Sequence, residues 1–107
     1  MKKQDIYEYI KERGQLMFPP EDTWVDFNIE GNALVVRYMD IRKLEVFAHT
    51  EDWNSGLIVR SSRGQRCSEV YKNYFVTESI NEVFFVINQE FGIYEDDQFE
   101  WIYENTP

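Results

Sequence analysis

The chain offers few residues that could do covalent chemistry: it has one histidine, His49, and one cysteine, Cys67. A cysteine nucleophile needs a base such as histidine within hydrogen-bond reach, and neither residue is flanked by a signature of such a pair. A site built from several histidines is excluded because there is only one. We therefore predict a protein that is not an enzyme, with no catalytic residue, no metal and no cofactor.

Three adjacent carboxylates, Glu95, Asp96 and Asp97, could bind a hard cation through their oxygens. An EF-hand loop, however, places its acids at alternate positions, with a glycine at the sixth position and a glutamate at the twelfth. The acids here are contiguous and that glycine is missing. We therefore interpret this stretch as an acidic turn exposed to solvent.

Four basic residues form a basic island between two acidic regions: Arg60, Arg63, Arg66 and Lys72. Their loop has the residue types of a phosphate site, but it lacks the Gly-Lys-Ser/Thr ending of a P-loop and leads into a predicted strand. Three interpretations stay open. The island could be a solvated hairpin loop, a nucleotide pocket shared with His49, or a surface that pairs with the acidic end of the same chain or of a second copy.

The C-terminal residues 77–107 combine negative charge with aromatic surface. They contain eight carboxylates, seven aromatic residues and no lysine or arginine. Tyrosine and tryptophan are favoured as anchors in protein interfaces, and ordering of a chain end normally requires a docking surface. The acidic aromatic strip that we predict to bind a partner consists of Tyr94, Glu95, Asp96, Asp97, Glu100, Trp101, Tyr103 and Glu104. A secondary acidic patch is predicted from Glu21, Asp22, Glu51 and Asp52.

These residues must be positioned by a small α+β fold. Helical spacing predicts a helix over 4–13 that ends at Gly14, and two prolines predict an extended connector over 16–20. Alternating apolar residues then predict a four- to five-stranded antiparallel meander, with a tight turn at Gly31 and Asn32. The predicted strands are residues 25–30, 33–39, 44–50, 57–60 and 68–76.

A second helix is predicted over 79–91, with a capping box of Ser79 and Glu82, Thr77 as an alternative cap, and Gly92 as its end. One continuous apolar face predicts core residues at Ile80, Val83, Phe84, Ile87 and Phe91. Phe85 and Val86 fall off this stripe. We expect this helix to pack with the first helix on one face of the sheet. Residues 99–103 fit either a strand or a helix.

Length and charge limit the classes of function. A chain of 107 residues predicts one domain, residues 1–107, with a single modest core. The N-terminus lacks the apolar segment of a signal peptide, and the single cysteine fits a reducing compartment, so we predict a cytoplasmic protein. A formal net charge of −9 argues against direct binding of nucleic acid or of anionic membranes. The same charge favours association with a basic protein surface.

Together these features favour a small acidic inhibitor that binds another protein and occludes a basic, nucleic-acid-handling surface. In size and charge the chain is similar to immunity proteins, antitoxins and phage anti-defence proteins, a resemblance of composition. Two alternatives belong to other classes. One is a homodimeric secretion chaperone or adaptor that holds an extended peptide, and the other is a nucleotide-binding or small enzymatic domain centred on the basic island.

Overall fold

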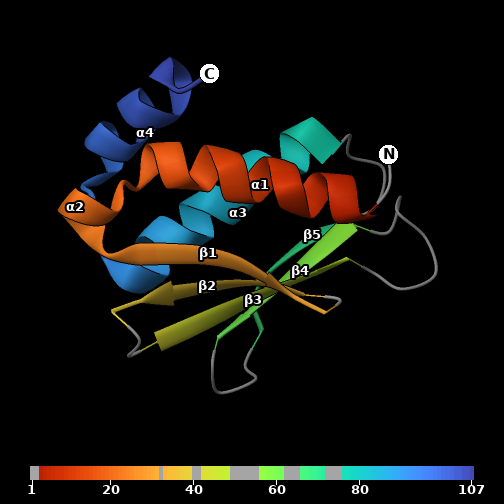
Figure 1. The fold of residues 1–107 in the computed structure, drawn as a ribbon. Helices are drawn as coiled ribbons and strands as arrows, with labels where there is room; N and C mark the ends of the chain where they lie inside the picture. Colours follow the sequence, from red (N-terminus) through yellow and green to blue (C-terminus); the bar gives the residue numbers. More distant parts are fainter. Residues whose placement is uncertain (1–2, 32, 40–41, 49–55, 62–65, 72–75) are drawn as a thin grey trace.

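The computed structural model shown in Figure 1 is an α+β protein, which confirms the predicted class. The structure describes residues 3–31, 33–39, 42–48, 56–61, 66–71 and 76–107, with side chains for 4–31, 33–39, 42–46 and 83–107. The helices among these residues are α1 (Lys3–Met17), α2 (Pro20–Thr23), α3 (Val76–Phe91) and α4 (Asp96–Asn105). The strands are β1 (Val25–Glu30), β2 (Ala33–Tyr38), β3 (Arg42–Ala48), β4 (Gly56–Ser61) and β5 (Arg66–Tyr71).

The strands lie in sequence order from β1 to β5, and each neighbouring pair is antiparallel. β1 and β2 form a hairpin in which Glu30 lies opposite Ala33 and Val25 lies opposite Tyr38. Gly31, at the turn, has a φ of +59°, a left-handed conformation that glycine adopts without the steric cost of a side chain. The predicted hairpin is therefore confirmed.

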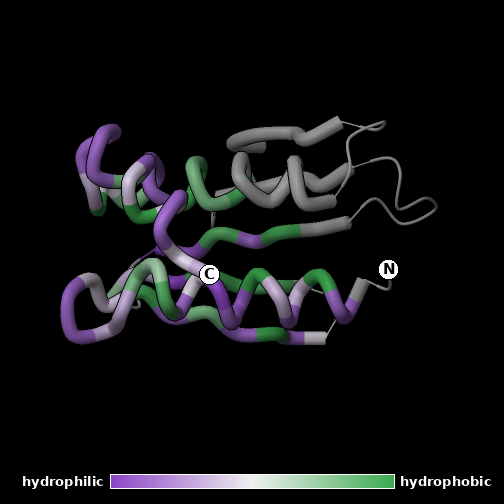
Figure 2. Tube along the Cα trace, turned by 90° about the horizontal axis from the view of Figure 1, so that it is seen from above, coloured by the Kyte–Doolittle hydropathy of each residue, from purple (hydrophilic) through white to green (hydrophobic). Residues whose placement is uncertain are grey.

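α1 and α3 cover the same face of the sheet (Figure 1). α1 contacts β1 and β2, α3 contacts β3, β4 and β5, and the two helices touch each other. Hydrophobic and hydrophilic residues alternate along α1 in Figure 2, as expected for a helix with one buried face. The core lies between this helical layer and the sheet.

One apolar cluster fills the space between the two layers. Its most buried members, each at most 1% exposed, include Ile6, Tyr7 and Ile10 of α1, Phe27, Leu34, Val36, Leu44 and Val46 of the sheet, and Val83, Phe84 and Ile87 of α3. Phe91 is also buried, so the predicted stripe on α3 is confirmed at all four of its positions whose side chains are described. Ile80, the fifth, lies outside the described side chains.

α1 does not end at Gly14, and this prediction was wrong. The helix runs on to Met17, and the Phe18 N–H donates a hydrogen bond to the Gly14 carbonyl at 2.9 Å. A Cβ atom at Gly14 would lie 2.4 Å from Cε1 and from Cζ of Phe27. The glycine is thus a site of close helix-to-strand packing. Because the helix continues, the predicted extended connector over 16–20 is also wrong at its first two residues, and it is wrong at Pro20, where α2 begins.

Other boundaries also differ from the predictions, most clearly those of β5 and α3. β5 covers Arg66–Tyr71, so it begins two residues before the predicted strand over 68–76. That prediction is wrong at Val76, which belongs to α3, and residues 72–75 lie outside the described residues. α3 begins at Val76, which places Thr77, Ser79 and Glu82 inside the helix rather than at its cap. Ser79 and Glu82 have the spacing of a capping box, but both residues lie inside the helix. The pattern therefore does not mark the start of α3. The end of α3 is confirmed, since Gly92 has a φ of +62°.

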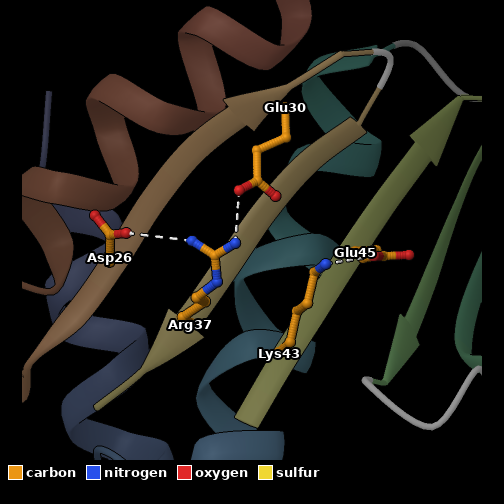
Figure 3. Close-up of polar contacts among 5 residues, drawn as sticks. All are labelled: Asp26, Glu30, Arg37, Lys43 and Glu45. Atoms are coloured by element: carbon orange, nitrogen blue, oxygen red, sulfur yellow. Dashed lines mark hydrogen bonds and ion pairs between the residues drawn. The ribbon is translucent and has the colours of Figure 1, made fainter. Parts of the chain in front are cut away.

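The face of the sheet away from the core carries charged side chains that are paired across and along strands (Figure 3). Arg37 on β2 donates a hydrogen bond to the Glu30 carboxylate at 2.6 Å and lies 3.9 Å from Asp26. Lys43 lies 3.0 Å from Glu45 on β3. The hydrogen bond from Arg37 lowers the pKa of the Glu30 carboxyl. In this part of the molecule acids are therefore matched by bases.

Candidate protein-binding surface

The predicted strip forms a helix, α4, together with the loop that leads into it. Glu95 is the N-cap, and its N–H donates a hydrogen bond to the Gln98 side chain at 3.3 Å. Asp96 and Asp97 occupy the first turn, where carboxylates are favourable near the positive end of the helix dipole. The sequence pattern of residues 99–103 fits both a strand and a helix, and the structure shows a helix.

One side of α4 packs against α3. Phe99 is 4% exposed and makes an edge contact with Phe85, with ring centroids 5.9 Å apart. The Tyr103 ring lies 6.4 Å from Phe84. Ile102 is half-buried against the same core. α4 is therefore an amphipathic helix whose inner side is held by aromatic contacts.

The other side of α4 is acidic and exposed. Its exposed residues include Asp96, Asp97, Glu100, Trp101 and Glu104, and the Trp101 side chain is 63% exposed. Asp97 accepts a hydrogen bond from the Gln98 N–H at 2.9 Å. Among the residues whose side chains are described, the ion pairs all lie on the sheet and none includes an α4 carboxylate. The negative charge of α4 thus faces solvent.

Arg13 of α1 ties down the C-terminal end of α4, a contact that the sequence did not reveal. Its Nη2 donates hydrogen bonds to the carbonyl of Tyr103 at 2.8 Å and to that of Thr106 at 3.2 Å. The guanidinium carbon also lies 4.2 Å from the centroid of the Tyr103 ring. A cation at this position binds carbonyls that have no partner within the helix and complements the negative end of its dipole.

Asn88 of α3 fixes the loop before α4. Its side-chain amide donates to the Tyr94 carbonyl at 3.0 Å, and its Oδ1 accepts from the Tyr94 N–H at 2.9 Å. Asn88 is 1% exposed, and it follows Phe84 by four residues, which places it next to the apolar stripe of α3. The sequence signal that could have singled it out is a polar residue four positions after a residue of the predicted apolar stripe.

Tyr94 is held from a second direction. Its hydroxyl donates a hydrogen bond to the Met17 carbonyl at 3.0 Å, and its ring stacks on Phe18 with centroids 5.6 Å apart. Burial raises the pKa of the Tyr94 hydroxyl, and the charge of Asp22 raises it further. Of the three aromatic residues predicted as anchors, Tyr94 and Tyr103 are thus half-buried by contacts within the chain, and Trp101 is the exposed one.

Replacing Asn88 with alanine is expected to lower the free energy of unfolding by about 1–2 kcal/mol, because the N–H and the carbonyl of Tyr94 both lose their partner at a half-buried site. Urea unfolding followed by circular dichroism measures the change. Gln89→Ala, at an exposed neighbouring position of α3, is the control and should stay within about 0.5 kcal/mol of the wild type. Equal stabilities of the two variants would show that the hydrogen bonds between Asn88 and Tyr94 do not contribute to the free energy of unfolding.

The secondary acidic patch is described only in part. Glu21 and Asp22 are exposed on α2, and the charge of Asp22 contributes to the raised pKa of Tyr94. Glu51 and Asp52 lie outside the described residues.

Two hollows flank the outer side of α4. The first has a volume of 360 Å³ and is lined by Phe85, Asp96, Phe99, Glu100, Tyr103 and Glu104. The second, around Trp101, has a volume of 460 Å³ and is lined by Tyr94, Asp97, Gln98, Trp101 and Ile102. Every residue of the predicted strip except Glu95 thus lines one of the two hollows.

The side chains of the basic island lie outside the described part of the chain. His49, Arg63 and Lys72 lie outside the described residues, and only the backbones of Arg60, Arg66 and Cys67 are described, on β4 and β5. The three interpretations of the island therefore stay as predictions. Among the described side chains, Arg13 is the base that contacts α4.

In the described part of the chain, no three acidic, histidine or cysteine residues are grouped closely enough to hold a metal ion. None of the helices found there has the length and apolar character needed to cross a bilayer.

Comparison of the chain with protein-family models, curated proteins and solved structures finds no match.

Proposed function

We propose that this chain is a non-enzymatic inhibitor that binds another protein through α4 and occludes a basic, nucleic-acid-handling surface. The observation that carries the proposal is the outer side of α4, where exposed carboxylates and the exposed Trp101 ring occur together with no ion-pair partner among the described side chains. On the sheet, by contrast, Asp26, Glu30 and Glu45 are paired with bases.

The spacing of these charges resembles that of a nucleic acid strand. A helix rises 1.5 Å per residue, so the interval from Asp96 to Glu104 spans about 12 Å. Four carboxylates, those of Asp96, Asp97, Glu100 and Glu104, lie in this interval, which gives one charge per roughly 3–4 Å, close to the 3.4 Å per phosphate of one DNA strand. A surface shaped to bind phosphates would therefore meet a comparable charge density on α4.

Trp101 supplies what a phosphate strand lacks. Large aromatic side chains are over-represented among the residues that dominate the energy of protein interfaces. Trp101 lies on the acidic side of α4, one residue after Glu100 and four residues after Asp97. Charge would steer the encounter with the partner, and burial of the indole would slow dissociation.

The experiment compares two triple variants that each reduce the formal net charge from −9 to −6. Asp97→Asn/Glu100→Gln/Glu104→Gln neutralises α4, and Asp5→Asn/Glu8→Gln/Glu12→Gln neutralises exposed acids of α1. The immobilised full chain captures its partner from an extract of the native host, and the recovered protein is then challenged with duplex DNA. We expect the α1 variant to behave like the wild type and the α4 variant to lose the partner.

Two further readouts test the mechanism. Binding of the wild type should weaken as salt is added, with a steeper dependence than that of the α4 variant, because fewer charges interact in the variant. Duplex DNA and the wild-type chain should compete for the recovered partner. The proposal fails if both triple variants retain the partner equally, or if the partner binds DNA and the chain at the same time.

A further inference from the structure

The first hollow beside α4 is a groove with an apolar floor and an acidic rim. The floor is formed by Phe85 of α3 and by Phe99 and Tyr103 of α4, and the rim by Asp96, Glu100 and Glu104. Phe85 is 37% exposed, although it lies on a helix whose other large apolar side chains are buried where they are described. The groove thus offers an aromatic contact that water still reaches.

We infer that this groove binds a basic amphipathic helix of the partner protein, with an apolar side chain on the Phe85 floor and arginine or lysine side chains on the rim. The inference rests on the proposed function and deepens it by naming the element of the partner that docks. It assigns the groove to one occupant through charge complementarity: the rim has three carboxylates, and none has an ion-pair partner among the described side chains.

The regular spacing of the rim carboxylates favours a helix as the occupant of the groove. Asp96, Glu100 and Glu104 are four residues apart, so they follow one another along α4 at intervals of about 6 Å. A second helix that lies along α4 presents its own side chains at the same interval when they are also four residues apart. Helices that dock in grooves present apolar anchors at this spacing, and charged residues beside the anchors can reach the rim.

The acidic rim argues against a nucleic acid strand and against a compact ligand as the occupant. A phosphate backbone would be repelled by the rim, since both are negative. A compact ligand could meet only part of a rim that extends over about 12 Å. Arginine fits both parts of the groove, because its guanidinium pairs with carboxylates and stacks on aromatic rings.

The test uses the full chain and two dye-labelled helical peptides of about 18 residues, a length at which alanine-rich helices form in water. The Arg/Leu peptide carries arginines four residues apart and leucines along the adjacent line. The Arg/Gln peptide has the same arginines, with glutamine in place of each leucine. Fluorescence anisotropy gives the Kd of each peptide, and circular dichroism verifies that every protein variant is folded.

Three variants locate the binding site. Phe85→Ala truncates the floor and should weaken binding of the Arg/Leu peptide about 10-fold, and Glu100→Gln removes one rim charge and should weaken it about 3-fold. Asp97→Asn is the matched control, because it removes an equal charge from the same helix but lines the second hollow. It should change the Kd by less than about 2-fold. The Arg/Gln peptide should bind the wild type about 10-fold more weakly than the Arg/Leu peptide.

Diffuse attraction between a negative protein and a positive peptide would give a different pattern. Asp97→Asn and Glu100→Gln would then act equally, and Phe85→Ala and the Arg/Gln peptide would make no difference. That pattern, or the absence of saturable binding of the Arg/Leu peptide, overturns the groove assignment. Neither outcome would affect the proposed function, whose test is the loss of the captured partner from the α4 triple variant. If instead the groove binds the peptide and no variant loses the partner, the proposed function fails alone.

Discussion

Replacing Arg13 with methionine is expected to lower the free energy of unfolding by about 3 kcal/mol. Methionine keeps much of the length and apolar contact of arginine but removes both hydrogen bonds to the carbonyls of Tyr103 and Thr106 and the cation over the Tyr103 ring. The last turn of α4 contains no base of its own. Its carbonyls therefore depend on α1.

Chemical unfolding measures the loss of stability, and amide hydrogen exchange shows where it arises. Exchange in α4 should accelerate more than exchange in β1 and β2, because α4 is held to the core by few contacts once Arg13 is gone. Arg13→Lys is expected to recover only part of the stability, since an ammonium is a compact charge without the planar fork that reaches two carbonyls. Lys11→Met, on the same helix, is the control. Equal effects at positions 11 and 13 would refute the role assigned to Arg13.

Gly14→Ala is expected to destabilise the protein by about 2 kcal/mol, although alanine is the better helix former. The added Cβ would lie 2.4 Å from two ring atoms of Phe27, a residue that is 1% exposed and has no room to move. Overpacking of this kind costs about 3 kcal/mol at the upper end of its usual range. The gain in helix propensity from glycine to alanine is about 1 kcal/mol. The cost of the steric overlap therefore exceeds the gain in helix propensity.

A double-mutant cycle tests this cause. Leucine at position 27 lacks Cε1 and Cζ, so Gly14→Ala should cost at least 1 kcal/mol less in a Phe27→Leu background than in the wild type, roughly the coupling seen for residues in contact. Gln15→Ala, at the next and exposed position of α1, should be neutral or slightly stabilising. If Gly14→Ala stabilised the protein by the same amount as Gln15→Ala, the close approach of α1 to β1 would be wrong.

Predictions that depend on local patterns agreed best with the structure. The β1–β2 hairpin follows from two-residue alternation around Gly31, and the core stripe of α3 follows from helical spacing up to Gly92. Predictions that depend on a single residue as a boundary signal were less accurate. Gly14 was interpreted as a helix end because glycine often serves there, while the structure uses it to let Phe27 approach.

The candidate surface was found in the sequence by composition but not by shape. Residues 94–104 stand out through their acids and aromatic rings, yet alternation and helical spacing fit residues 99–103 equally well. Packing of Phe99 against Phe85 selects the helix and separates a buried side from an acidic one. That separation leaves Trp101 exposed and Tyr94 and Tyr103 half-buried, a distinction that no local pattern contains.

By itself the sequence determined the α+β class, the hairpin, the core stripe of α3 and the concentration of negative charge near the C-terminus. Those features depend on periodicity and charge over short stretches, which are properties of neighbouring residues. Only the tertiary structure decided that the acidic aromatic strip is a helix, that Asn88 and Arg13 hold it, and that a groove with an acidic rim runs beside it. Arg13 and Tyr103 are 90 positions apart, and an interaction over such a separation exists only once the chain has folded.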